Sequence, residues 1–324
     1  MNPSRRQFFN AALGAVLLPA TTRFAHAQSY PMRPVRVIVG FAAGQAIDIQ
    51  ARSISQWLSD RLGQQFIIEN LPGAGGNIGA ERVVRAQPDG YSLLTVGANN
   101  YINASLYEHL EFDFARDIAP VASIGRLPNV MEVNPSLPTT TVPEFIAYAK
   151  VNPGKLNFGS AGVGTTHHMA GELFMMMTGV KMVHVPYRGT PRALNDLISG
   201  RIQVMFDNLP TSIGHIRAGK LRALAVTTKA RSELLPDIPT VGDFVPGFEV
   251  SAVTGIGAPK DTPTDIIDRL NQQINAGLND PSIKAHFASL GITVSPGSPD
   301  DFRKLIASEI AKWAKVVRFA DVKA

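Results

Sequence analysis

Two short glycine-containing loops are the segments of this sequence best suited to hold an anion. The first, FAAGQAID at residues 41–48, ends an apolar run and opens a helical pattern. The second, SAGVGTTHH at residues 160–168, has the same arrangement and adds hydroxyl groups. Backbone N–H groups at a helix start lack intrahelical acceptors and carry about half a positive charge from the helix dipole. Two such loops could face each other across a cleft and close on an anion.

Each loop taken alone could also be a tight turn in which glycine supplies backbone freedom. FAAGQA lacks the G-x-G-x-x-G spacing of dinucleotide-binding loops, and the later GAGGNIG follows Pro72 rather than running directly from a strand. No Gly-Lys-Ser/Thr follows, which excludes a P-loop. These spacings argue against the two common nucleotide-binding loops.

His167 and His168, at the start of the second helix, raise the question of metal or acid–base chemistry. Glu172 lies one turn beyond His168, but zinc usually needs a third protein ligand and the neighbouring sequence offers none. A Ser-His-Asp hydrolase would need the G-x-S-x-G elbow, which is absent. We therefore expect no catalytic residue, no metal and no cofactor. The enzyme alternative is a hydrolase or decarboxylase that uses His168 with Asp207.

Two aspartates admit both a structural and a ligand-binding role. Asp48 falls in the first turn of the helix after the first loop, where a carboxylate caps free N–H groups. Asp207 ends a strand in VMFDNLP and could cap the helix that begins near Pro210. Both also lie where a ligand is expected, because open parallel sheets bind ligands at the carboxyl ends of their strands.

Strand and helix patterns alternate from Val35 onward, which predicts an α/β fold with parallel strands and right-handed crossovers. A proline-rich stretch at 134–143 separates two similar units. Strands are expected at 35–41, 65–71, 91–98, 156–160, 182–187, 202–207 and 221–227. Helices are expected at 48–62, from the glycine-rich PGAGGNIG to about 87, from the SAGVGTTHH loop to about 178, at 192–199, through 215–218, and near 264–278, 281–290 and 299–319.

The first 27 residues have the features of a signal peptide. Arg5 and Arg6 precede the apolar run AALGAVLLPA, and Ala25-His26-Ala27 offers the small-x-small pattern of a cleavage site. The residues around the two arginines also resemble a twin-arginine signal, and an ordinary export signal is the alternative. We expect a periplasmic protein cleaved near Ala27.

The composition of the remaining chain excludes several classes of protein. Loss of Arg5, Arg6 and Arg23 lowers the 31 basic residues to 28 against 26 acidic residues, so the mature chain is nearly neutral. Basic residues form no stripe interleaved with aromatics, so we expect no nucleic-acid partner. The chain has no cysteine, so no disulfide supports the fold.

The sequence resembles the periplasmic solute-binding proteins of the Bordetella uptake gene family, which serve tripartite tricarboxylate transporters. The resemblance covers essentially the whole mature chain, and it is carried by these strings: FAAGQAID, ENLPGAGGNIGA, PDGYSLL, NPGKLNFGSAGVGT, MVHVPYRG, VMFDNLP, AGKLRALAVTT and AKWAKVV. It implies a type II periplasmic-binding-protein fold with two α/β domains, a hinge and an interdomain cleft. The implied domains are residues 28–127 with 254–324, and residues 128–253.

The resemblance also implies a binding site for a small carboxylated solute between the two loops. In the first domain it points to Phe41, Ala43, Gly44, Asp48, Ala98 and Asn99. In the second domain it points to Ser160, Ala161, Gly162, Thr165, Thr166, Tyr187, Arg188, Gly189 and Asp207. Five residues depart from the family pattern: Ala42, Gln45, Ile47, Val163 and His167. We include two of them, Gln45 and His167, in the predicted site.

These departures suggest a bulkier or less polar ligand than is usual, because Ile47 removes a hydroxyl and the Cβ of Gln45 restricts its loop. Asp48 would repel a second carboxylate, whereas Arg188 could bind one bidentately. We expect a monomer that presents its solute to a membrane permease. A sensor subunit that signals to a kinase is the alternative.

Overall fold

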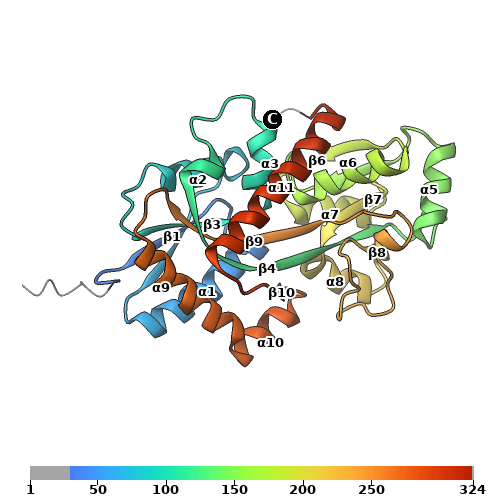
Figure 1. Ribbon diagram of the computed structural model, residues 1–324. Coiled ribbons are helices and arrows are strands. Elements are labelled where there is room, and N and C mark those ends of the chain that lie inside the picture. The colour runs from blue at the N-terminus through green and yellow to red at the C-terminus, as the bar shows by residue number, and fades with distance from the viewer. Residues whose placement is uncertain (1–29, 323–324) are drawn as a thin grey trace, which may run out of the picture.

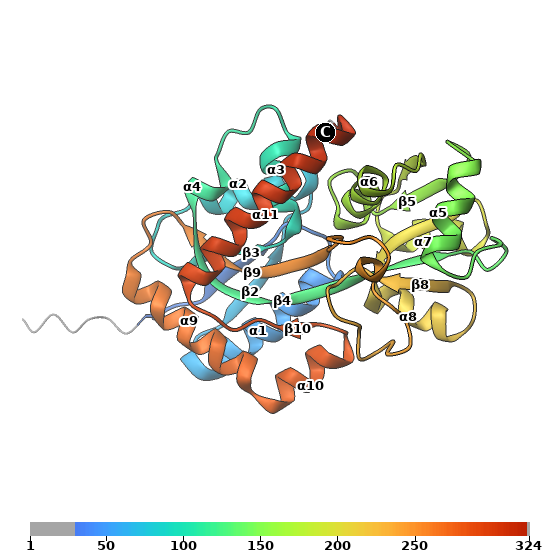
Figure 2. The same cartoon turned by 45° about the vertical axis from the view of Figure 1, so that its right-hand side comes forward.

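The computed structural model describes residues 30–322, so the expected signal peptide lies outside the described residues. The chain forms two α/β lobes side by side (Figures 1 and 2). The first lobe contains β1 Val35–Val39, α1 Ala46–Leu62, β2 Phe66–Asn70, α2 Asn77–Val84, β3 Ser92–Val96, α3 Ala98–Leu106, α4 Phe114–Asp117, α9 Thr264–Asn279, α10 Pro281–Ser289 and β10 Thr293–Val294. The second contains α5 Val142–Val151, β5 Asn157–Ser160, α6 Thr166–Thr178, β6 Val183–Pro186, α7 Thr190–Ile198, β7 Val204–Asn208, α8 Leu209–Arg217 and β8 Arg222–Val226.

Two long strands, β4 Ile118–Val133 and β9 Ser251–Pro259, pass between the lobes (Figure 1). The strand order is β2-β1-β3-β9-β4-β7-β5-β6, with β8 and β10 also paired to β4. From Ile118 to Pro128, β4 pairs antiparallel with β9. From Asn129 to Val133 it pairs antiparallel with β7. One continuous strand therefore belongs to the sheets of both lobes.

Parallel strands were predicted from the sequence, whereas β4 and β9 were not. Parallel pairing holds for β1 with β2 and β3, and for β5 with β6 and β7. The parallel pairing predicted for the first three strands is thus confirmed, whereas the β3–β9 and β4–β9 pairs, which involve strands that were not predicted, are antiparallel. β4 is almost wholly buried and contains two prolines, so it shows neither strict alternation nor an uninterrupted strand pattern.

The local sequence explains where helix α1 lies and where it ends. α1 buries Ala51, Ile54 and Leu58 on one face, which is the stripe that the 3.6-residue period predicted. It ends at Gly63, whose φ of 70° is the left-handed conformation that glycine adopts most easily. The predicted helix is confirmed, and it begins two residues earlier than expected, at Ala46.

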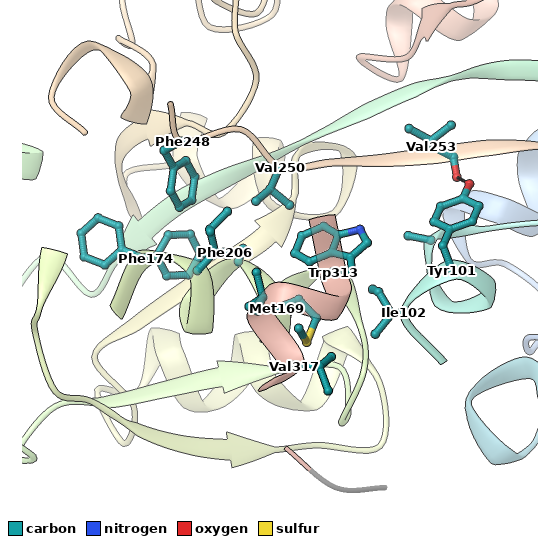
Figure 3. Packing of buried hydrophobic residues seen from close by; sticks show 14 of the residues in the cluster. Tyr101, Ile102, Met169, Phe174, Phe206, Phe248, Val250, Val253, Trp313 and Val317 are labelled. Atoms are coloured by element: carbon teal, nitrogen blue, oxygen red, sulfur yellow. Dashed lines mark hydrogen bonds between the residues drawn. The ribbon is translucent and has the colours of Figure 1, made fainter. Parts of the chain in front are cut away.

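The last helix, α11 Pro299–Ala320, lies against both lobes (Figures 1 and 2). It packs on α3 of the first lobe and on α6 of the second. Trp313 is fully buried at its centre, and its indole N–H donates to Glu309 Oε2 at 2.9 Å. Figure 3 shows Trp313 between Ile102 and Met169, which belong to different lobes. A continuous apolar core therefore joins the lobes along this helix.

No helix within residues 30–322 combines the length and apolar character needed to cross a membrane.

Trp313→Ala should destabilise the protein by about 3–5 kcal/mol, because it removes the largest side chain from the core that joins the lobes. Thermal unfolding followed by circular dichroism would measure the loss. The control is Lys315→Ala, an exposed position on the same helix. Equal midpoints for the two variants would show that α11 does not couple the lobes as described.

Candidate ligand-binding site

A cavity of about 830 Å³ lies at the junction of the two lobes. All predicted site residues except Asp48, Ser160 and Asp207 line it: Phe41, Ala43, Gly44, Gln45, Ala98, Asn99, Ala161, Gly162, Thr165, Thr166, His167, Tyr187, Arg188 and Gly189. The structure thus brings residues far apart in sequence to one place. Their role as ligand contacts stays a prediction.

The starts of five helices meet at this cavity. The N-cap residues of α1, α3, α6, α7 and α8 all line it: Gln45, Gly97, Thr165, Gly189 and Asn208. At α1 the amides of Ala46 and Ile47 donate to no acceptor within residues 30–322, and at α6 the same holds for the amides of Thr166 and His167. Free N–H groups and aligned dipoles make this junction favourable for an anion.

Asp48 lies behind the first loop and not in the cavity wall. It is 1% exposed, and its carboxylate accepts hydrogen bonds from Gly44 N at 2.8 Å, from Arg52 Nε at 2.9 Å and from Asn70 Nδ2 at 2.9 Å. Asn70 Nδ2 also donates to Phe41 O at 2.9 Å. Asp48 and Asn70 therefore hold the loop in place. The expected repulsion of a ligand carboxylate by Asp48 stays a prediction, and protein donors already surround the Asp48 carboxylate.

Gln45, which departs from the family pattern in the first loop, has an ordinary backbone conformation. Gln45 has φ −78° and ψ 160°, an extended conformation open to any residue. The left-handed conformation falls on Gly44 instead, with φ 85°. The proposed backbone restriction by Gln45 was therefore wrong, and the effect of this residue is confined to its side chain in the cavity.

Ser160 is buried beneath the second loop. Its Oγ accepts from Gly162 N at 3.1 Å and lies 2.7 Å from His184 Nε2. The ring of His184 stacks on that of His168 with centroids 3.7 Å apart, and His168 Nδ1 accepts from Gly164 N at 3.3 Å. Burial and the nearby His168 lower the pKa of His184 to about 3, so its ring is neutral at pH 7. These contacts fix the loop from below.

Asp207 is also buried behind the wall. Its Oδ2 accepts from Thr211 Oγ1 at 2.6 Å and from Ser212 Oγ at 2.7 Å, while Oδ1 lies 2.9 Å from His167 Nε2. The enzyme alternative paired Asp207 with His168, but His168 stacks on His184 instead and its Nε2 lies 3.4 Å from Glu172. The described residues contain no group of three or more His, Cys, Asp or Glu able to hold a metal ion.

The charge of the wall favours an anion. No Asp or Glu side chain is among the lining residues. Arg188 lines the cavity and forms no ion pair with any of residues 30–322. The remaining wall combines polar groups with apolar side chains such as Phe41, Ile47 and Leu127. The wall therefore offers both positive charge and apolar surface.

Part of the cavity wall was not predicted from the sequence. The residues it did not include in the site are Ala42, Ala46, Ile47, Gln50, Pro72, Gly73, Gly75, Gly97, Leu127, Val163, Thr190, Pro191, Asn208, Thr211, Ala252 and Thr254. Several follow directly from the predicted loops or from the motif VMFDNLP, which contains Asn208. Leu127, Ala252 and Thr254 lie on β4 and β9, which the sequence patterns did not reveal.

Comparison with known proteins places this arrangement in a family. Residues 50–321 match the tripartite tricarboxylate transporter family receptor, TctC. BugT of Bordetella pertussis is 36% identical over 295 residues, 90% of each chain. An R. palustris protein solved with adipate has a TM-score of 0.84 and 38% identity, covering 91% of this chain and 99% of that chain. MatC from Rhodopseudomonas palustris, solved with bound malate, has a TM-score of 0.80 and 31% identity, covering 89% and 100%.

The chain belongs to the tripartite tricarboxylate transporter receptor family, in which the Bug proteins also fall. Receptors of this family are periplasmic solute-binding proteins, so the chain is a binding receptor and not an enzyme. The two-lobed α/β fold expected from the sequence resemblance is confirmed.

Asp48→Asn should destabilise the protein at pH 7 by about 1–3 kcal/mol, because it weakens charge-assisted hydrogen bonds within the first loop. Burial alone would raise the pKa of the Asp48 carboxyl, but the bonds from Arg52, Gly44 and Asn70 together lower it below its usual value. Its stabilisation is therefore present above the unfolded pKa of about 3.9 and is lost as the pH falls below that value.

The gap in melting temperature between the native chain and Asp48→Asn should accordingly narrow as the pH is lowered from 7 to about 3. Differential scanning calorimetry across this range would record it. Asp60→Asn, at an exposed position on the same helix, serves as the control and should change the melting temperature little. A gap that stays constant with pH would contradict the role assigned to the ionised Asp48.

Proposed function

We propose that this receptor captures a small carboxylated organic solute in the interlobe cavity for a tripartite tricarboxylate-type transporter. The observation that carries the proposal is the convergence of five helix N-termini on a cavity whose wall has no acidic side chain. Each N-terminus contributes about half a positive charge, and Arg188 adds a full one. An anion is the ligand that this field favours.

The solute carboxylate is assigned to the free amides at the starts of α1 and α6. These two helices belong to opposite lobes, so one carboxylate bridging them would hold the lobes together. Hydrogen bonds to a charged acceptor are roughly twice as strong as neutral ones, and exclusion of water strengthens them further. The adipate and malate bound by the two structural neighbours support a carboxylate as the ligand class.

The lobes are assigned as residues 28–127 with 254–324, and residues 128–253. Support comes from β4, which changes pairing partner between Pro128 and Asn129, and from β9, which begins at Ser251. Rotation about these two strands would open and close the cavity. Ligand that binds the closed form more tightly shifts the population toward it, and this form would then be presented to a membrane permease.

Export to the periplasm with cleavage near Ala27 completes the proposal, together with a monomeric mature chain. The family and its solved periplasmic members support this location.

Native mass spectrometry of the freshly exported protein is the direct test of ligand class. We expect a carried-over carboxylic acid, released on denaturation and identified by mass. After unfolding and refolding to remove it, calorimetry with adipate, malate and a panel of other mono- and dicarboxylates should show binding at one site per chain. An emptied, folded protein that binds no carboxylate would refute the proposed function.

Arg188→Ala should weaken binding of a dicarboxylate by about tenfold or more, because a charged hydrogen bond contributes about 1.5–3 kcal/mol. Its melting temperature should be unchanged, since the side chain is exposed. Arg192→Ala is the matched control, because Arg192 is exposed on the neighbouring helix and does not line the cavity. Equal affinities in the two variants would exclude Arg188 as a ligand contact.

A further inference from the structure

A single hydroxyl group lies between two buried carboxyl groups in the second lobe. Ser212 Oγ, on α8, lies 2.7 Å from Glu132 Oε1 on β4 and 2.7 Å from Asp207 Oδ2 on β7. All three side chains are fully buried. The contact therefore joins β4, β7 and α8 where no water reaches the groups involved.

The number of protons at this contact requires a protonated carboxyl group. A serine hydroxyl has one proton, so it can donate to only one of two acceptors. If both carboxyl groups were ionised, one charged oxygen would lie 2.7 Å from the hydroxyl oxygen with no proton between them. If one carboxyl group is protonated, it donates to Ser212, and Ser212 donates to the other. Both contacts are then hydrogen bonds.

Glu132 has the surroundings of the protonated member. Ser212 is the only hydrogen-bond partner of its carboxyl group within residues 30–322, and its Oε2 is buried without a partner. Opposite Glu132 on β8 lies Ala223, which belongs to an apolar cluster. Asp207 has Thr211 Oγ1 at 2.6 Å from Oδ2 in addition to Ser212. A charge would be less well compensated on Glu132, so the proton belongs there.

No basic side chain on the elements packed around Glu132 forms an ion pair with it in the described part of the chain. Arg222 on β8 donates to two backbone carbonyl groups, and His167 on α6 lies 2.9 Å from Asp207 Oδ1. His215 on α8 forms no ion pair among residues 30–322. The charged residues that follow on α8 and after β8 are exposed: Arg217, Lys220, Lys229, Arg231, Glu233 and Asp237.

The expected titration of Glu132 agrees with these contacts. Burial, followed by the charge of Asp207, raises the pKa of Glu132 well above its usual value, and the contact with Ser212 offsets this only in part. We propose that Glu132, Ser212 and Asp207 form a pH-sensitive device in which protonated Glu132 donates to Ser212 and Ser212 donates to Asp207. Loss of this proton as the pH rises leaves two buried charges on one hydroxyl and weakens the joint of β4, β7 and α8. The inference does not depend on the identity of the ligand.

The sign of the pH dependence follows from the two states of Glu132. In the unfolded chain its carboxyl group has a pKa of about 4.3, whereas in the folded protein it keeps its proton to a higher pH. Between these values the folded chain binds one proton more than the unfolded chain, so stability falls as the pH rises. The contribution is fully present below the unfolded pKa and is lost as the pH rises through the folded pKa.

Infrared spectroscopy of the mature protein at pH 7 tests the proton directly. A protonated carboxyl group has a carbonyl stretching band separate from the bands of carboxylates. We expect a band of this kind that shifts when the side-chain carboxyl groups of glutamate are labelled with ¹³C and that is lost in Glu132→Gln. Glu111→Gln, at an exposed position, is the control and should keep the band. Absence of the band, or a band that the glutamate label does not shift, would overturn the inference.

Urea unfolding at a series of pH values tests the consequence for stability. Glu132→Gln cannot titrate at this position and has the shape of the protonated acid. Relative to this variant, the folding equilibrium constant of the native chain should fall by about tenfold per pH unit between about pH 5 and pH 7, as one bound proton requires. Groups common to both chains cancel in the ratio. Glu111→Gln should instead show the same pH dependence as the native chain.

A ratio between the native chain and Glu132→Gln that stays constant with pH would contradict the proposal. The labelled native chain carries the test even if Glu132→Gln folds poorly, because the infrared band and its isotope shift are measured without a variant.

Discussion

Unpaired backbone N–H groups at converging helix starts are the constraint on which the cavity depends. They cannot be satisfied within their own helices, so water or an anion must supply the acceptors. Two buried carboxylates behind the wall are already engaged: Asp48 by Arg52, Gly44 and Asn70, and Asp207 by Thr211 and Ser212. These two carboxylates therefore hold the loops in place and are not acceptors for the free amides.

Buried side chains hold both loops in place through hydrogen bonds and ring stacking. In the first lobe, Asp48 and Asn70 fix the backbone from Phe41 to Gly44. In the second lobe, Ser160 and the stacked histidines below it fix the backbone from Gly162 to Gly164. Pre-ordered donors lower the conformational entropy lost on binding, so affinity can be high although few charged side chains face the solute.

The two lobes are joined by packed secondary structure as well as by the connecting strands. β4 and β9 cross between them, and α11 buries Trp313 between residues of both. A large apolar contact of this kind restricts the relative motion of the two lobes. The same geometry brings the N-cap residues of α1 and α6, one from each lobe, to the lining of one cavity.

The sequence by itself determined the alternating α/β pattern, the helices closed by Gly63 and Gly179, and the loops that line most of the cavity, because these depend on local periodicity and on glycine at helix ends. Only the tertiary structure decided that Asp48 and Asp207 lie behind the wall, since their partners Asn70 and Ser212 are reached through the packing of separate elements. It also revealed β4, β9 and the support from His184. A strand buried on both faces has no alternation to read, and its neighbours are set by contacts between residues more than a hundred positions apart.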